Sequence, residues 1–186
     1  SESSTGMFTK NSGNLTDSTI KNEGTINQEA KNTVGIYTPK SDIQKVGKIN
    51  LNDDAESSVA VYLSNTAKAD ASTGDIDLNS VSQNQVAYYV TGTGSSDTGV
   101  IYGSSIGSIK GYGVGVYLDG TDSDGKALPT PAQLNAPALD FTTGSTQGKG
   151  IIGLLLKGNT DISTYSGGRI KVGDTAESVN GNKFYA

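Results

Sequence analysis

The chain has 186 residues, a formal net charge of −5 and a pI near 4.6. Cys, His and Trp are absent and Arg169 is the single arginine, which excludes disulfide scaffolds, thiolate chemistry, and catalysis or metal binding through Cys or His. Nucleic acid is a poor partner for so acidic a chain, because binding to it requires clustered Lys and Arg to neutralise phosphates.

The apolar residues make up 33% of the chain and gather at regular places, which argues against disorder. There is no run of 18 apolar residues, so we expect no direct insertion of this segment into a membrane as a helix. The N-terminus also lacks the basic and apolar regions of a signal peptide. We therefore expect an ordered chain that acts outside the bilayer.

Residues 1–13 are polar and rich in Ser, Thr and Gly. Within them, Gly-Met-Phe-Thr at 6–9 resembles a degraded copy of a strand that recurs later in the chain. We interpret residues 1–13 as an N-terminal edge or partial coil, with a frayed terminus as the alternative.

From residue 14 onward a two-strand phrase recurs. Its first strand has the form Gly-x-Ile and alternates apolar with polar residues, and its second has the form Val-small-apolar-Tyr. The clean copies of the first strand begin at Gly24, Gly47, Gly74 and Gly107, and those of the second at Val34, Val59, Val86 and Val114. Looser copies follow near Ala138 and from Gly168 to Tyr185. Counted from residues 24, 47, 74, 107, 137 and 168, the copies are 23 to 33 residues apart, a period typical of solenoids.

A third, weaker apolar patch lies between the strand pairs of consecutive copies. It comprises Ile43 and Val46, Ala67 and Ala69, Val100 and Ile101, and Ile162. Three short strands per period predict one triangular coil of a parallel β-helix, in which Ile26, Ile49, Ile76 and Ile109 stack as an internal column. The predicted fold is all-β with almost no helix, and about seven coils at ~4.8 Å would form a rod of roughly 34 Å.

Residues 14–186 are thus expected to form one β-helical segment, with longer loops at 91–98 and 119–135. The competing β architectures fit less well. The strands are too short and too polar for a membrane barrel, and the period is too short for a propeller blade. A sandwich would not need the same residues to recur at the same places.

The acidic residues allow two further hypotheses. β-Helical enzymes that act on polysaccharides use Asp clusters, and the candidate groups here are Asp53, Asp54 and Glu56, Asp75 and Asp77, and Asp119, Asp122 and Asp124. No Lys or Arg recurs beside them, so solvated carboxylates are the simpler interpretation. The last group could also form a loose calcium site, but it does not fit the EF-hand spacing. We predict no catalytic residue, no metal site and no cofactor.

Tyrosines occupy one position of the repeat, namely Tyr37, Tyr62, Tyr89, Tyr117 and Tyr185. If Val34 and Ile36 point inward, strict alternation sends Gly35 and Tyr37 outward. The stacked coils would then present a row of tyrosines suited to sugar or protein contacts, with a purely structural aromatic ladder as the alternative. The candidate ligand-binding residues are Tyr37, Tyr62, Tyr89, Tyr117, Asp119, Asp122 and Asp124.

The phrases Gly-Thr-Ile-Asn at 24–27, Gly-Lys-Ile-Asn-Leu-Asn at 47–52 and Val-Gly-Ile-Tyr at 34–37 resemble passenger domains of type V autotransporters. They are most similar to the very large fusobacterial autotransporter adhesins of the RadD type. The resemblance covers residues 14–186 and is looser after 117. It implies a right-handed parallel β-helix at the cell surface, attached through an outer-membrane barrel that lies outside this segment. It carries over no functional residue.

The resemblance implies a non-catalytic adhesin segment that attaches bacteria to host cells or to other bacteria through a surface protein or a glycan. Two alternatives stay open, a carbohydrate-active β-helix enzyme that uses an Asp cluster and a structural spacer of a longer adhesin that binds nothing itself.

Overall fold

A computed structural model describes residues 5–8, 19–39, 41–64, 67–78, 84–91, 100–102, 107–135, 138–142, 151–162 and 169–172. These residues form strands β1 to β18 and one short 3-10 helix, η1 (Ala71–Thr73). The strands form three parallel sheets with six strands each. In the described part of the chain, no helix is long and apolar enough to cross a membrane.

The three sheets, which we call A, B and C, contain every third strand in chain order. Sheet A contains β1 (Thr5–Phe8), β4 (Val34–Thr38), β7 (Val59–Leu63), β10 (Val86–Thr91), β13 (Gly113–Gly120) and β16 (Ile151–Gly158). Sheet B contains β2 (Thr19–Lys21), β5 (Asp42–Lys45), β8 (Lys68–Asp70), β11 (Val100–Tyr102), β14 (Ala132–Asn135) and β17 (Thr160–Asp161). Sheet C contains β3 (Thr25–Gln28), β6 (Gly47–Leu51), β9 (Gly74–Leu78), β12 (Ser108–Gly111), β15 (Ala138–Thr142) and β18 (Arg169–Val172).

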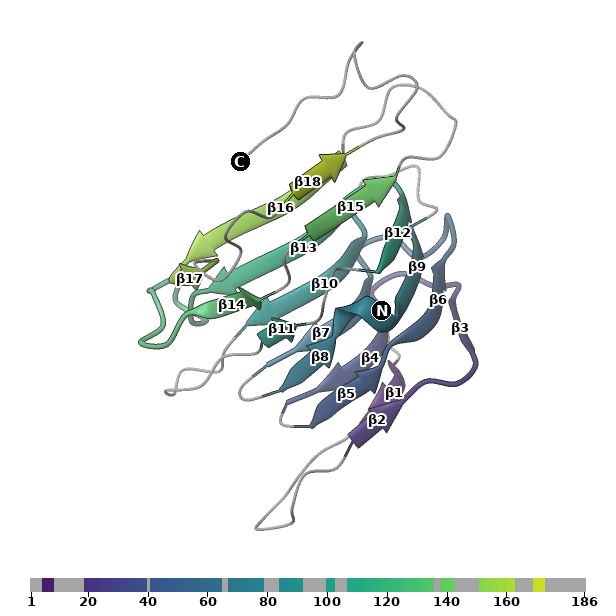
Figure 1. Cartoon of the computed structure of the whole chain (residues 1–186), viewed down its shortest axis with the longest axis horizontal. Coiled ribbons are helices and arrows are strands. Elements are labelled where there is room, and N and C mark those ends of the chain that lie inside the picture. The colour runs from purple at the N-terminus through teal and green to yellow at the C-terminus, as the bar shows by residue number, and fades with distance from the viewer. Residues whose placement is uncertain are drawn as a thin grey trace.

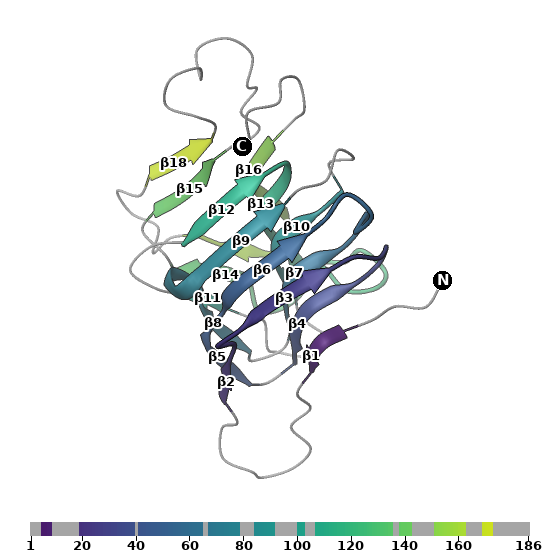
Figure 2. The same cartoon turned by 90° about the vertical axis from the view of Figure 1, so that its right-hand side faces the viewer.

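The chain therefore winds as a parallel β-helix, and the predicted fold class is confirmed (Figures 1 and 2). Strands β2 to β16 make five complete coils, each passing through sheets B, C and A in turn. Strand β1 belongs to the coil before them, and β17 and β18 belong to the coil after them. Strand β1 pairs with β4 so that Met7 lies opposite Ile36 and Phe8 opposite Tyr37, the register that a partial coil gives.

The interior is built from columns of equivalent residues. In sheet C, Ile26, Ile49, Ile76 and Ile109 follow one another in register, as the repeat predicts, and Ile49 and Ile76 are fully buried. Burying one such side chain contributes about 1.5 to 3 kcal/mol relative to leaving it exposed. A single coil has no partner for this face, so the stacking of coils makes the core.

Strict alternation fails in sheet A, where the expectation that Gly35 faces outward is wrong. A Cβ added to Gly35 would lie 3.2 Å from Cγ2 of Ile49 in the core and 2.6 Å from the carbonyl oxygen of Ala60. The equivalent residues of the next two coils, Ala60 and Ala87, are fully buried, as is Ile36. Two successive positions thus face the interior, and the first admits only a small residue because sheet C lies close to it.

Candidate functional site: the tyrosine ladder and Asp119

The predicted tyrosine column forms a continuous ladder along sheet A. The parallel register places Tyr37 opposite Tyr62, Tyr62 opposite Tyr89, and Tyr89 opposite Tyr117. The centroids of neighbouring rings are 5.1, 4.9 and 4.9 Å apart in that order. These distances lie within the range of direct aromatic contacts. Leu155 continues the column on β16, and Tyr185 lies outside the described residues.

The ladder lies on the outer side of sheet A. Tyr37 stands between Ile36 and Thr38, which are both fully buried, whereas Tyr37 itself is half-buried. The same holds for Tyr62 between Val61 and Leu63. Because neighbouring residues of a strand point to opposite sides, the tyrosine side chains are directed outward, as the alternation predicts for this position.

The orientation of the rings limits what they can bind. The planes of Tyr62 and Tyr89 are 31° apart, so these two rings are tilted relative to one another. Tyr37 meets Tyr62 at 77° and Tyr89 meets Tyr117 at 85°, both edge to face. Each ring thus packs directly against its neighbours in the ladder. A ligand on this side of sheet A would meet half-buried rings that are already packed against one another.

Burial also shifts the ionisation of the phenols. It raises the pKa of Tyr62 and of Tyr117 above the ordinary value of 10.0. The pKa of Tyr89 is raised further, first by burial and then by its hydrogen bond to Asp119. The hydroxyls of Tyr62, Tyr89 and Tyr117 thus stay protonated well above neutral pH.

Asp119 joins the ladder at the end of β13. The strand continues to Gly120 and β14 begins at Ala132, so the loop predicted at 119–135 comprises only residues 121–131. Asp119 lies two residues after Tyr117, on the same side of the sheet, with Thr91 and Lys157 opposite it on the adjacent strands. Of the predicted loop at 91–98, Thr91 is the only described residue and forms the end of β10.

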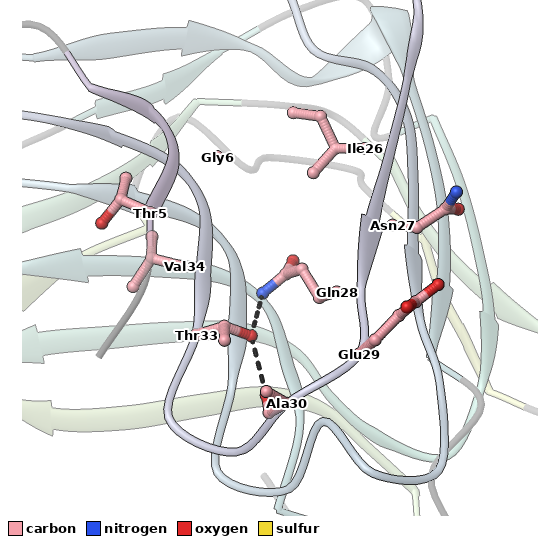
Figure 3. Close-up of a pocket in the computed structure, with 9 residues that line it drawn as sticks. All are labelled: Thr5, Gly6, Ile26, Asn27, Gln28, Glu29, Ala30, Thr33 and Val34. Carbon is pink, nitrogen blue, oxygen red and sulfur yellow. Dashed lines mark hydrogen bonds between the residues drawn. The ribbon is translucent and has the colours of Figure 1, made fainter. Parts of the chain in front are cut away.

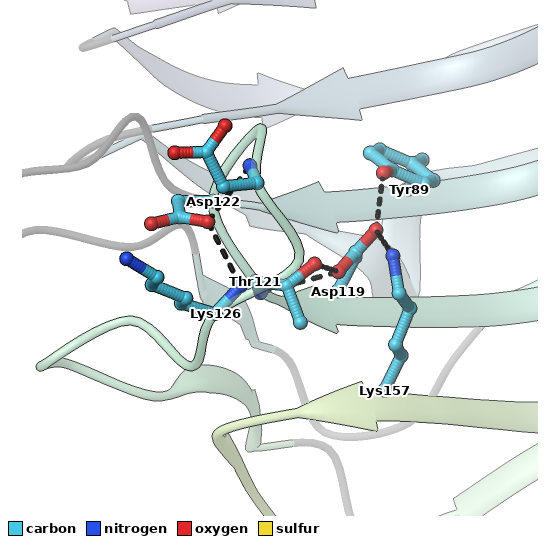
Figure 4. Close-up of polar contacts among 7 residues, drawn as sticks. Tyr89, Asp119, Thr121, Asp122, Lys126 and Lys157 are labelled. Carbon is cyan, nitrogen blue, oxygen red and sulfur yellow. Dashed lines mark hydrogen bonds and ion pairs between the residues drawn. The ribbon is translucent and has the colours of Figure 1, made fainter.

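Four contacts hold the carboxylate of Asp119, a residue that is only 6% exposed (Figure 4). The Tyr89 hydroxyl donates to Oδ2 at 2.8 Å, and Nζ of Lys157 lies 3.3 Å from the same oxygen. The Thr121 hydroxyl and amide donate to Oδ1 at 2.6 and 3.2 Å. Burial acts to raise the pKa of Asp119, but the hydrogen bonds from Thr121 and Tyr89 and the charge of Lys157 outweigh it, so the pKa lies below 3.8.

Asp122 and Asp124 do not belong to this cluster and instead form a turn. Oδ1 of Asp122 accepts hydrogen bonds from the amides of Asp124 and Lys126, both at 2.9 Å. Its carbonyl oxygen accepts from the Gly125 amide at 3.0 Å, and Gly125 has a φ of 77°. This is a tight hairpin turn with glycine at the left-handed position. Among the described residues no three acidic side chains gather as a metal site, so the calcium hypothesis finds no support at these aspartates.

The other acidic residues of the enzyme hypothesis lie at separate places. Asp53, Asp54 and Glu56 follow β6, and Glu56 pairs with Lys31 at 2.5 Å. Oδ1 of Asp75 on β9 lies 3.9 Å from Nζ of Lys110 on β12, and both side chains are about half exposed. Neither set is among the contacts of the Asp119 carboxylate, which are made by Tyr89, Lys157 and Thr121.

Sequence reasoning missed Thr121 and Lys157 as partners of Asp119. The sequence did contain a signal for Lys157. Asp119 lies two residues after Tyr117 and Lys157 two residues after Leu155, so both fall in one column of the repeat. Comparison with family models, with curated proteins and with solved structures finds no match to this chain.

Proposed function

We propose that this chain is a non-catalytic binding segment of a bacterial surface adhesin. In this proposal the segment is displayed outside the cell, attached through an outer-membrane barrel beyond this segment. It contacts a host-cell protein or glycan, or another bacterial surface, through the tyrosine ladder. The repeat phrases and their resemblance to autotransporter passengers support the surface location. The outward row of tyrosine hydroxyls supports the binding role and carries the proposal.

The ladder has physical properties that favour binding. Tyrosine offers a large contact area and a polar hydroxyl at a small entropic cost, because it has only two side-chain torsions to fix. Here the rings already contact one another, with centroids about 5 Å apart, so the side chains lose little further conformational freedom when a ligand binds. The hydroxyl groups repeat once per coil and form a regular row of donors and acceptors.

The test is binding of this segment to host cells, to bacterial cells and to immobilised glycans, with variants that separate the hydroxyls from the rings. A Tyr37→Phe, Tyr62→Phe, Tyr117→Phe variant removes three hydroxyls and keeps the stack. We expect it to lose tenfold or more in affinity, since each hydrogen bond contributes about 1 kcal/mol. Asn27→Ala with Asn50→Ala, on sheet C, is the matched control and should bind as the native protein does.

Three results would redirect the proposal. Equal binding by the triple variant would place the contact surface outside the ladder. Absence of binding by this segment, with binding by a longer protein that contains it, would make it a spacer. Turnover of an acidic polysaccharide, abolished by Asp→Asn changes at positions 75 and 77, would favour the enzyme.

A further inference from the structure

Tyrosine is the main oxidisable side chain of this protein. The sequence contains 9 tyrosines, but it has no Cys, Trp or His and a single methionine, Met7. The two residue types that oxidants commonly modify, cysteine and methionine, are thus absent or nearly so. Met7 packs partly buried against the core, whereas the tyrosine ladder lies half-buried on the outer side of sheet A. An oxidant that reaches this face from solvent therefore meets phenols first.

The ladder holds two of these phenols in a favourable arrangement for coupling. Tyr62 on β7 and Tyr89 on β10 are paired residues of adjacent parallel strands, and their ring centroids are 4.9 Å apart. Their planes differ by 31°, whereas the other two contacts of the ladder are edge to face at 77° and 85°. Because the two side chains start from paired positions and their rings are the closest to parallel, corresponding ring atoms are neighbours in this pair.

Asp119 supplies the proton acceptor that oxidation of a phenol requires. Loss of one electron makes a phenol a strong acid, so oxidation at neutral pH is easiest where a base already holds the hydroxyl proton. The Tyr89 hydroxyl donates to Oδ2 of Asp119 at 2.8 Å (Figure 4). The hydrogen bonds from Thr121 and the charge of Lys157 keep this carboxylate ionised. Tyr89 is thus a phenol from which an electron and a proton leave together readily.

The cavity of the chain lies apart from these phenols. It has a volume of about 270 Å³ and is lined by residues of β1, β3, β4 and the link between β3 and β4 (Figure 3). None of the lining residues is a tyrosine. A molecule held there has no phenol to oxidise, so the oxidant approaches the ladder from the outer side of sheet A.

We propose that the ladder is an oxidation site, at which two equivalents of a one-electron oxidant from solvent convert Tyr62 and Tyr89 into a dityrosine cross-link. Each phenol gives one electron to the oxidant and its hydroxyl proton to a base, which is Asp119 for Tyr89 and water for Tyr62. The two radicals form one carbon–carbon bond between the ring positions next to the oxygens. The hydrogens on these two carbons leave as protons, and both oxygens take up protons again, which restores the aromatic rings. The chain has then lost two electrons to the oxidant and two protons to solvent.

The cross-link would fasten one coil of the solenoid to the next. It joins β7 to β10, which are already paired in sheet A, so the strands keep their register. A covalent link between two positions of a chain restricts its unfolded state and thereby stabilises the folded one. The ladder would thus convert an oxidising environment into a more stable rod. This inference goes beyond the proposed binding function and needs no ligand.

The experiment illuminates the purified, dilute chain with a ruthenium tris-bipyridyl complex, with persulfate as the electron acceptor. Dityrosine fluorescence and the masses of proteolytic peptides identify the product. We expect a monomer that is lighter by two hydrogen atoms, has Tyr62 joined to Tyr89, and unfolds at a higher denaturant concentration than the untreated chain. Tyr62→Phe should abolish this cross-link. Tyr37→Phe is the matched control, since it makes the same change in the same ladder, and it should retain the cross-link.

A second pair of variants tests the proton acceptor. Asp119→Asn keeps the shape of the side chain but replaces the carboxylate by an amide, which is a much weaker base, so the cross-link should form several-fold more slowly. Thr121→Ala removes another hydrogen bond to the same carboxylate and keeps the acceptor, so it should react at the native rate. Circular dichroism before illumination checks that both variants are folded.

Equal rates for Asp119→Asn and the native chain would overturn the role of the carboxylate. Cross-links found only between molecules, or within the chain at another pair of tyrosines, would overturn the proposed site. The outcome is separate from that of the adhesin proposal, because no ligand is present. A chain that cross-links but binds no cell or glycan supports this inference alone, and a chain that binds but does not cross-link contradicts it alone.

Discussion

The hydroxyl of Tyr89 donates a 2.8 Å hydrogen bond to Oδ2 of Asp119, a residue 30 positions away on the adjacent strand. Thr121, at the start of the loop after β13, binds the other oxygen of the same carboxylate. The bond therefore connects the tyrosine ladder to this loop. Its removal should affect both, and this makes Asp119 the most informative residue of the site.

Asp119→Ala should lower the free energy of unfolding by about 2 to 3 kcal/mol, because hydrogen bonds to a charged group each contribute about 1.5 to 3 kcal/mol and several donors lose their acceptor. Chemical denaturation, followed by the β-sheet signal of circular dichroism, measures this change. Asp124→Ala, in the loop that follows β13, is the control. Its side chain is exposed, so it should stay within about 0.5 kcal/mol of the native protein. Equal stability of the two variants would contradict the role given to Asp119.

The same carboxylate should make stability depend on acid pH. The pKa of Asp119 in the folded chain lies below the ordinary 3.8, so the folded state favours the ionised form. The stabilisation is therefore fully present above the unfolded pKa and is lost as the pH falls from about 4 through the lower folded pKa. Unfolding midpoints measured across this range should fall less steeply for Asp119→Asn than for the native chain. Parallel curves would contradict the assignment.

Tyr62 tests whether the ladder stabilises the fold. Its ring contacts Tyr37 and Tyr89 at centroid distances of 5.1 and 4.9 Å. Tyr62→Ala should lower the free energy of unfolding by about 2 to 4 kcal/mol, since it removes a half-buried ring and two aromatic contacts worth about 0.5 to 1.5 kcal/mol each. Tyr62→Phe keeps both contacts and should change stability by less than about 1 kcal/mol. A small effect of Tyr62→Ala on thermal unfolding would show that the ring is held without contributing to stability.

Much of the fold follows from the sequence because a solenoid repeats its local rules. The isoleucine and tyrosine columns are in the structure where the repeat places them. The position of Gly35 could not be predicted, since its inward orientation depends on the distance to Ile49 in another sheet. Alternation within one strand contains no information about that distance.

The grouping of the three aspartates could not be predicted either, because it depends on where a strand ends. Their closeness in the sequence makes Asp119, Asp122 and Asp124 look like one acidic group, but β13 ends at Gly120, between Asp119 and the other two. Asp119 is the last outward position of the strand and joins the tyrosines, whereas Asp122 forms the turn. Gln28 stands in the column that contains Leu51 and Leu78 in the next two coils. The repeat alone therefore marks it as a polar exception in an apolar column.

The isoleucine column should be intolerant of charge. Ile49 is fully buried, and an ionised carboxylate without a partner in the core is strongly unfavourable. Ile49→Asp should therefore prevent folding at neutral pH, and Ile49→Ala should lower stability by about 2 to 5 kcal/mol. The neighbouring Lys48 is exposed, so Lys48→Thr serves as the control. Circular dichroism and unfolding curves would decide, and a folded Ile49→Asp variant would contradict the assignment of this column to the core.

Gly111 provides a test of the close approach between successive coils. It has a φ of 95°, and a Cβ added there would lie 1.5 Å from the carbonyl oxygen of Leu78 on the adjacent strand of sheet C. That oxygen accepts a 2.9 Å hydrogen bond from the Tyr112 amide. An alanine at 111 must therefore displace the backbone of one of the two coils, in addition to the strain of a left-handed conformation, which is about 1 to 2 kcal/mol for a residue with a side chain. Gly111→Ala should destabilise the chain by more than about 3 kcal/mol.

Gly24 is the matched control for that substitution. It directly precedes β3 in the same sheet, has no heavy atom within 4 Å of an added Cβ, and is exposed. Gly24→Ala should leave stability unchanged or raise it by about 0.4 to 1 kcal/mol, because alanine restricts the unfolded chain. Denaturant unfolding of both variants measures the difference. If Gly111→Ala were as stable as Gly24→Ala, the spacing between β9 and β12 would have to be wider than the structure gives, and the stacking of Ile76 on Ile109 in the same pair of strands would have to be looser as well.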